Sequence, residues 1–319
     1  MAEAYIVAAA RTAGGRKGGR LSGWHPADLS AQVLNALLDR SGADPAVVDD
    51  VIMGCVTQTG EQAFNIARNA VLASRLPESV PGTSVDRQCG SSQQALHFAA
   101  QAVMSGSMDV VIAAGVESMS RVPMGTNVVL PQKAGMGHYM SPAIRERYPD
   151  VQEFSQFVGA EMLVSKYGLD KDQLDAYALS SQQRAIEATR AGRFADEIVP
   201  VEAILHDGTR TGELHTVDEG IRFDTSLEAI QGVQPLREGG SISAANASQI
   251  CDGAAGVMVV NERGLKALGV EPLARIHHMT VIGHDPVIML EAPIPATEQA
   301  LKKAGMKLDD IDLFEVNEA

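Results

Sequence analysis

Cys89 is the residue whose type and surroundings most clearly indicate chemistry. An apolar run ends at Val85, and an Ala-rich segment with helical spacing covers Ala95–Met104, so the thiol lies where a strand passes into a helix. Free backbone N–H groups and the helix dipole favour an anion at that end of a helix, which increases the fraction of nucleophilic thiolate. The small residues 90–92 leave room for an acyl group. The alternative is a buried structural thiol, the usual state of a free cysteine.

The other two cysteines, Cys55 and Cys251, do not indicate a second reactive site. The chain has 3 cysteines, an odd number at wide spacing, which excludes a disulfide framework and a zinc motif. We therefore expect no metal, and we expect reduced thiols in a cytoplasmic protein. Cys251 follows a small polar turn and is expected to be packed.

The overall charge limits the possible partners. The formal net charge of −14 argues against nucleic acids and anionic membranes. No apolar run approaches the length of a membrane span. The apolar run Tyr5–Ala10 follows an acidic residue and no basic one, which predicts a buried strand rather than a signal peptide.

Residues 1–118 alternate between apolar runs and helical patterns. The predicted strands are 5–10, 47–56, 83–85 and 108–116, with helices predicted to begin near 26, 63 and 95. This alternation predicts an α/β fold with a largely parallel sheet covered on both faces. Such sheets place their chemistry at the carboxyl ends of the strands, where Cys89 is expected. The Gly-rich basic loop Arg11–Arg20 lacks the G-K-[ST] sequence of a phosphate-binding loop, so we do not assign it that role.

Residues 119–249 depart from this pattern and predict an inserted domain. Their periodicity is broken, and clear helical patterns occur only at 156–167 and 173–190. The segment is too long for a plain loop and is expected to have structure of its own. The chain then returns to the first α/β half over 250–270.

Residues 271–319 predict the start of a second α/β half. A strand is expected at 273–283, a helix at 295–304 and another strand at 309–319. This order, with a glycine and an acidic turn before the last strand, resembles the beginning of the chain and suggests a duplicated half that is incomplete in its second copy.

Seven short motifs resemble those of the thiolases, which are acyl-CoA acetyltransferases. They occur in the thiolase order along the whole chain. They are Arg11-Thr12, Gly60–Arg68, Asp86–Ala95, Gly115–Ser120, Gly192–Pro200, Asn246–Ala255 and Phe314–Ala319. The resemblance implies two duplicated βαβαβαββ halves in α-β-α-β-α layers, with a large inserted loop domain. It also implies a homodimer or homotetramer.

The resemblance implies a role for four residues. Cys89 would accept an acyl group from an acyl-CoA, and a carbanion formed from a second CoA thioester would attack it in a Claisen condensation; thiolysis of a 3-ketoacyl-CoA is the reverse. Asn317, in N-E-A, would hold a water that stabilises the thioester oxygen. Ser248 would lie against the pantetheine arm of CoA and Arg222 near its adenine. No cofactor is implied beyond the CoA thioesters, which are substrates.

The 319 residues also depart from the thiolase pattern. They contain neither the G-H-P histidine that activates the nucleophile nor the C-x-G-G-G cysteine that moves the α-proton. We therefore expect this chain to be a truncated product or part of a longer one, with negligible turnover alone. Ser155-Gln156-Phe157 stands where biosynthetic thiolases often carry His-Met-Gly, which favours a longer or bulkier acyl group.

Two other functions remain open at this stage. One is a ketoacyl synthase of the same fold, and the other is a non-catalytic CoA-binding or assembly module. The site residues also have structural alternatives: Asn317 as a turn residue at a strand end, Ser248 as a helix N-cap, and Arg222 as a solvated loop charge.

Overall fold

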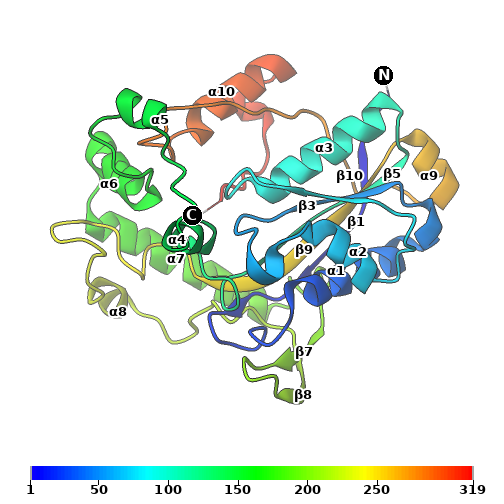
Figure 1. Ribbon diagram of the computed structural model, residues 1–319, viewed down its shortest axis with the longest axis horizontal. Coiled ribbons are helices and arrows are strands. Elements are labelled where there is room, and N and C mark those ends of the chain that lie inside the picture. The colour runs from blue at the N-terminus through cyan, green and yellow to red at the C-terminus, as the bar shows by residue number, and fades with distance from the viewer. Residues whose placement is uncertain (1, 318–319) are drawn as a thin grey trace. The chain divides into compact units, whose positions relative to one another are not determined.

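The computed structural model describes residues 2–317. Contacts between Cα atoms divide the chain into two compact units. The first unit comprises Met1–Leu130, Ala191–Gly220 and Ile250–Ile276, and the second comprises Pro131–Arg190, Ile221–Gln249 and His277–Ala319. The first unit contains the sheet that positions Cys89 (Figure 1).

The sheet of the first unit has the strand order β10-β1-β9-β5-β3-β4. These strands are β1 (Tyr5–Thr12), β3 (Asp50–Gly54), β4 (Gly82–Val85), β5 (Val110–Ser118), β9 (Cys251–Val260) and β10 (Ala274–Arg275); the two-residue strands β2 (Gly15–Arg16) and β6 (Ile198–Val199) join β9 and β1. β3 is parallel to both β4 and β5, but β9 runs antiparallel between β1 and β5. The α/β prediction is confirmed, whereas the expectation of a largely parallel sheet is wrong. The reason is that β9 re-enters the sheet from the inserted segment in the opposite direction.

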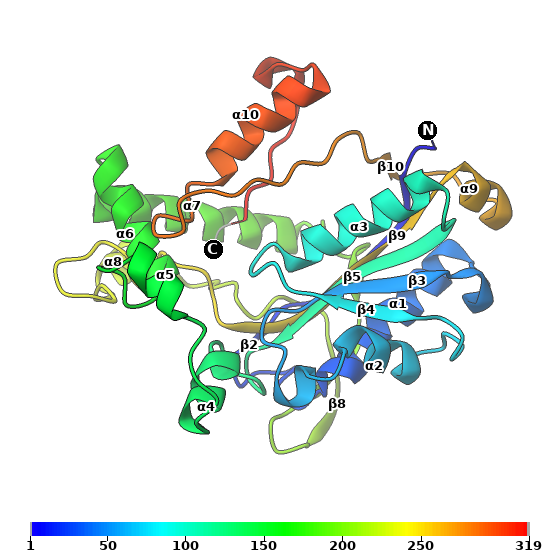
Figure 2. The same ribbon diagram turned by 45° about the horizontal axis from the view of Figure 1, so that its top comes forward.

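Helices cover both faces of this sheet, as expected. In Figure 2, α3 (Ser91–Ser105) lies on one face, and α1 (Pro26–Ser41) and α2 (Ile66–Ala73) lie on the other; α9 (Glu262–Leu268) follows β9. α1 begins with Pro26 at its first position, where a missing N–H costs nothing, and ends at Gly42 in the left-handed region.

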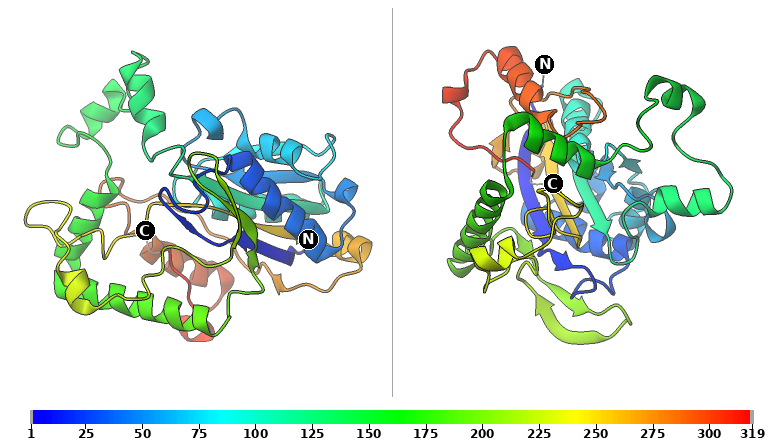
Figure 3. Two further views of the ribbon diagram at one scale, coloured as in Figure 1. Left: turned by 90° about the horizontal axis from the view of Figure 1, so that it is seen from below. Right: turned by 90° about the vertical axis from the view of Figure 1, so that its left-hand side faces the viewer.

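The Gly-rich loop Arg11–Arg20 is hydrogen-bonded to residues that follow a β-hairpin of the first unit. β7 (Val201–Ile204) and β8 (Arg210–His215) form this antiparallel pair, light green in Figure 3. Asp218, just beyond it, accepts from the Gly14 N–H at 2.6 Å, and Glu219 accepts from the Arg20 N–H at 2.9 Å. These carboxylates occupy backbone donors that a phosphate would need, which agrees with rejecting a phosphate-binding loop.

The described part of the second unit is helical. Its helices are α5 (Pro142–Arg147), α6 (Gln156–Tyr167), α7 (Lys171–Arg190), α8 (Leu227–Gln231), α10 (Pro293–Ala304) and the single-turn 3₁₀ helix η3 (Leu308–Asp310). α4 (Thr126–Lys133) spans the boundary between the two units' ranges. The other single-turn 3₁₀ helices, η1 (Pro45–Val47) and η2 (Gly60–Gln62), belong to the first unit. Within residues 2–317, no helix has the length and apolar content that a membrane crossing requires.

The strands expected at 273–283 and 309–319 are largely wrong. Only Ala274–Arg275 forms a strand, paired with β1, and residues 311–317 have no regular structure. Residues 318 and 319 lie outside the described part. A strand needs a neighbour to satisfy its backbone groups, and the side chains of Leu313 and Phe314 are 90% and 62% exposed rather than packed on a sheet.

Candidate active site

Cys89 lies in the turn between β4 and α3. α3 begins at Ser91 with Gly90 as its N-cap, so Cys89 precedes the first helical residue by two positions. Cys89 is exposed, which contradicts the alternative of a buried structural thiol. The helix ends at Gly106 in the left-handed region, as its sequence predicts.

Hydrogen bonds between residues that are close in sequence fix the conformation of this turn. Gln88 adopts a φ of 48°, which non-glycine residues seldom do. Its N–H donates to Asp86 Oδ1 at 2.8 Å, and its carbonyl accepts from the Ser91 N–H at 3.0 Å. The Arg87 N–H donates to Ser91 Oγ at 2.9 Å. Cys89 is therefore carried by a turn whose backbone is pinned on both sides.

Two glycines bring the helix down onto the sheet. Gly54 of β3 and Gly115 of β5 are paired in register. A Cβ on Gly54 would lie 2.3 Å from the Ser92 nitrogen, and one on Gly115 would lie 1.9 Å from Ser92 Oγ. Both distances are far below van der Waals contact. Sequence reasoning missed these two positions, although a glycine in each apolar strand segment, in M-G-C and A-A-G, was a visible signal.

Glu117 of β5 fastens the segment that follows β3. Its carboxylate accepts from the N–H groups of Val56 and Thr57 at 2.9 and 3.2 Å and from Gln62 Nε2 at 2.9 Å. Cys55 Sγ lies 3.8 Å from the same carboxylate. Burial, and then the Glu117 charge, raise the pKa of the Cys55 thiol, so this cysteine has little thiolate at neutral pH.

Cys251 corrects one expectation. It is exposed rather than packed, because it is the first residue of β9 and lies at the end of the strand, beside β2. Limited hydration and the charge of Asp252 raise the pKa of its thiol. The fully buried Asp252 accepts from the Ser120 N–H at 2.8 Å and from Ser118 Oγ at 3.2 Å.

Ser248 lies in the second unit, in an exposed segment without regular structure. The alternative of a helix N-cap is therefore wrong. The preceding turn is anchored through Asn246, whose Nδ2 donates to Asp175 Oδ1 at 2.9 Å. Asp175 is fully buried in α7 and also binds Lys171 Nζ at 2.5 Å. The N-A-S turn thus has a buried, charged attachment that sequence reasoning did not identify.

The remaining predicted site residues also belong to the second unit. Arg222 is exposed, and its backbone N–H donates to Gln182 Oε1 of α7 at 2.8 Å. Asn317 is exposed and lies outside any strand, so its alternative as a strand-end residue is wrong. The structure places Ser248, Arg222 and Asn317 in the second unit and Cys89 in the first.

The second unit also contains a largely apolar pocket of about 310 Å³. Its lining residues are Phe157, Glu161, Leu236, Arg237 and Ile242. The Glu161 carboxylate accepts from the Ile242 N–H at 3.0 Å, which fixes one wall. In residues 2–317, no group of three His, Cys, Asp or Glu side chains is arranged to hold a metal ion.

Comparisons with known proteins agree on one family. The family described as "Thiolase, N-terminal domain" matches residues 4–263, and "Thiolase, C-terminal domain" matches residues 270–319. The steroid 3-ketoacyl-CoA thiolase FadA6 of Mycobacterium tuberculosis is 50% identical over 324 residues, covering 100% of this chain and 77% of that protein. The 3-ketoacyl-CoA thiolase of Cronobacter sakazakii is 41% identical, covering 100% and 80%.

Solved structures show the same fold. The acetyl-CoA acetyltransferase of Bacillus anthracis superimposes with a TM-score of 0.88 at 35% identity. Human mitochondrial 3-ketoacyl-CoA thiolase in complex with CoA has a TM-score of 0.85 at 35% identity. Each match covers 100% of this chain and 80% of the other.

Proposed function

Because this chain belongs to the thiolase family, we propose that it transfers acyl groups between coenzyme A thioesters through a thioester on Cys89. The observation that carries this proposal is the exposed Cys89 thiol just before α3, whose first turn packs against Gly54 of β3 and Gly115 of β5. A helix N-terminus favours the negative charge that develops on the attacked carbonyl oxygen.

In thiolysis, the Cys89 thiolate would attack the 3-keto carbon of a 3-ketoacyl-CoA. The bond between carbons 2 and 3 breaks, its electron pair stays on carbon 2, and protonation there releases acetyl-CoA. The thiol of free CoA then takes the acyl group from sulfur, which regenerates the Cys89 thiolate after CoA loses its proton. Claisen condensation is the same sequence in reverse, with Cys89 acylated by the first thioester.

The other site roles are part of the same proposal. Asn317 would hold the water at the thioester oxygen, Ser248 would contact pantetheine and Arg222 would lie near adenine. The buried Asp175–Asn246 attachment supports the role of Ser248 because it fixes the turn that presents this residue. We propose no resident cofactor and a cytoplasmic location for the enzyme.

The proposed substrates are 3-ketoacyl-CoA thioesters with bulky acyl groups. The 50% identical relative is named as a steroid 3-ketoacyl-CoA thiolase, which supports a bulky acyl group. Comparing a short straight-chain substrate with a polycyclic one tests this proposal: the larger acyl group should be preferred, and preference for the short chain would refute it.

A polypeptide limited to these 319 residues is proposed to turn over slowly. It contains no G-H-P or C-x-G-G-G motif, and general acid–base assistance is typically worth about 10²–10⁴-fold. Multiple-turnover release of CoA from acetyl-CoA measures this directly. Turnover equal to that of a thiolase containing both motifs would contradict the proposal.

Acylation itself is tested by incubating the protein with acetyl-CoA and measuring its intact mass and the released CoA. The proposal predicts one acetyl adduct per chain, which Cys89→Ser abolishes and the matched control Cys251→Ser retains. Tight CoA binding without any adduct would instead favour a non-catalytic module. Acylation by a carrier-protein thioester but not by acetyl-CoA would favour a ketoacyl synthase.

We also propose a homodimer that uses the exposed edge of β4. This strand ends the sheet, and Phe64 beside it is 94% exposed at a φ of 57°. An open strand edge next to an exposed aromatic ring favours association. Sedimentation velocity should give a dimer, or a tetramer built from it, that Phe64→Ser weakens; a monomer at micromolar concentration would refute this.

A further inference from the structure

We infer that Gly54 and Gly115 are positioning residues that set the height of the Cys89 turn above the sheet through Ser92. They are register partners on adjacent parallel strands, and both are buried. Ser92 belongs to the first turn of α3, which Figure 2 shows lying along β5 and β3. The pair forms a side-chain-free platform on which the helix begins.

The two glycines make different contacts with the helix. At Gly54 an added Cβ would meet backbone, with Ser92 N at 2.3 Å and Ser91 C at 2.4 Å. At Gly115 it would meet a side chain, with Ser92 Oγ at 1.9 Å and Ser92 Cβ at 3.0 Å. Backbone can only yield by moving the helix, whereas the second clash disappears in large part when Ser92 loses its hydroxyl.

A displacement at Ser92 would reach the sulfur through the turn. The Gly90 N–H donates to the Arg87 carbonyl at 3.1 Å, and the Ser91 N–H donates to the Gln88 carbonyl at 3.0 Å. Cys89 lies inside these two bonds, so the turn moves as one body with the first residues of α3. A shift of about 1 Å in a reacting group can cost about 10²-fold in rate.

The inference rests on the proposed role of Cys89, but its test does not need turnover. The rate of Cys89 alkylation by iodoacetamide is followed by peptide mass spectrometry in Gly54→Ala, Gly115→Ala, Ser92→Ala and the two double variants with Ser92→Ala. We expect each glycine variant to alkylate about two- to fivefold more slowly, the size of a helix terminus's effect on an anion. Ser92→Ala should restore the rate in Gly115→Ala and not in Gly54→Ala.

Gly256→Ala is the matched control. This buried glycine of β9 faces α1 on the other side of the sheet, where a Cβ would lie 3.0 Å from Leu37 Cδ1. It should change stability without changing Cys89 alkylation. Because the Gly115→Ala and Ser92→Ala pair is decisive by itself, the test holds even where Gly54→Ala does not fold.

Three results would overturn the inference. They are an unchanged alkylation rate in Gly115→Ala, equal rescue of both glycine variants, and a loss in Gly256→Ala as large as in Gly115→Ala. If the variants show the expected alkylation rates but the wild-type protein accepts no acyl group, the proposed function is refuted and this inference stands.

Discussion

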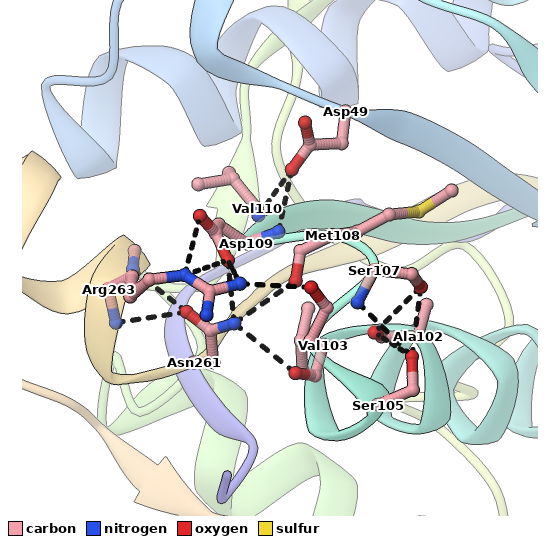
Figure 4. A network of polar contacts seen from close by, with 12 residues as sticks. Asp49, Ala102, Val103, Ser105, Ser107, Met108, Asp109, Val110, Asn261 and Arg263 are labelled. Atoms are coloured by element: carbon pink, nitrogen blue, oxygen red, sulfur yellow. Dashed lines mark hydrogen bonds and ion pairs between the residues drawn. The ribbon is translucent and has the colours of Figure 1, made fainter.

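The two ends of α3 are built in opposite ways. At its start, Cys89 is exposed, and the hydrogen bonds of the turn join residues that are close in sequence. At its end, Nδ2 of the buried Asn261 donates to the carbonyls of Val103 and Met108 at 3.2 and 3.0 Å. Asn261 also donates to Asp109 Oδ1 at 2.8 Å (Figure 4). One end is open to a ligand, and the other is bonded to distant parts of the chain.

The hydrogen-bond network at the C-terminal end of α3, which we call the closed end, joins α3 to α9, β3 and β5. Arg263 of α9 pairs with Asp109 at 2.6 Å and donates to the Gly106 carbonyl at 3.0 Å. Asp49, before β3, accepts from the N–H groups of Asp109 and Val110 at 2.7 and 3.0 Å (Figure 4). The hydrogen bonds from distant parts of the chain therefore hold α3 at the end opposite Cys89. This leaves the Cys89 turn accessible while the position of the helix stays fixed.

Removing the Cys89 sulfur should have the largest effect on acyl transfer and almost none on stability. Cys89→Ala is expected to lower acyl transfer on the order of 10⁴-fold or more, the usual consequence of deleting a nucleophile. Because the residue is exposed, the free energy of unfolding should change by no more than about 0.5 kcal/mol. Single-turnover acylation and urea unfolding measure the two quantities. Residual acylation within tenfold of wild type would show that another group accepts the acyl chain.

Asn261→Ala should have the opposite pattern. It removes the Asn261 Nδ2 group, whose two N–H groups are shared among three oxygens, and the N-cap of α9, where Asn261 Oδ1 accepts from the N–H groups of Arg263 and Gly264 at 3.0 Å. Loss of a cap and of buried hydrogen bonds should lower the free energy of unfolding by about 2–4 kcal/mol. Cys89 alkylation in the folded protein should stay at the wild-type rate. A slowed alkylation would mean that the closed end also shapes the open one.

These contrasts also show what sequence reasoning could reach. The junction at Cys89 was predictable because a strand run, small turn residues and an Ala-rich helix lie next to one another in the chain. The direction of β9 was not, since it depends on how the inserted segment returns. Residues 311–317 read as a strand from their apolar pattern, but a strand also needs a neighbour. The pairing of Gly54 with Gly115 joins two segments that no local pattern connects.

Backbone conformation gives a smaller contrast between the ends. Gln88 and Gly106 flank α3, and both have positive φ, 48° and 76°. Gly106→Ala should lower the free energy of unfolding by about 1 kcal/mol, since alanine is strained in that region. Gln88→Gly should be neutral or stabilising by up to about 1 kcal/mol because glycine relieves the strain. Chemical denaturation of both variants measures this, and a large loss in Gln88→Gly would show that its side chain is needed structurally.

The smallest expected effect is the dependence of stability on pH through Asp109. Arg263 and then Asn261 hold the pKa of the partly exposed Asp109 below its usual range. A depressed carboxyl pKa contributes stability that is present above the unfolded value of about 4 and is lost as pH falls through the folded value. The stability of wild type relative to Asp109→Asn should therefore decline below about pH 4. A difference between the two proteins that does not vary between neutral pH and pH 2 would contradict the ion pair's role.

The central claim is that the open end of α3 presents the acyl-accepting sulfur. It is tested most directly by incubating the protein with a 3-ketoacyl-CoA, adding an alkylating reagent, and measuring by peptide mapping how far each of the three cysteines has reacted. The account predicts an acyl group on Cys89 that blocks its alkylation, continued alkylation of Cys251, and an unreactive Cys55 until the protein is unfolded. An acyl group on another residue, or full alkylation of Cys89 after acyl transfer, would contradict it.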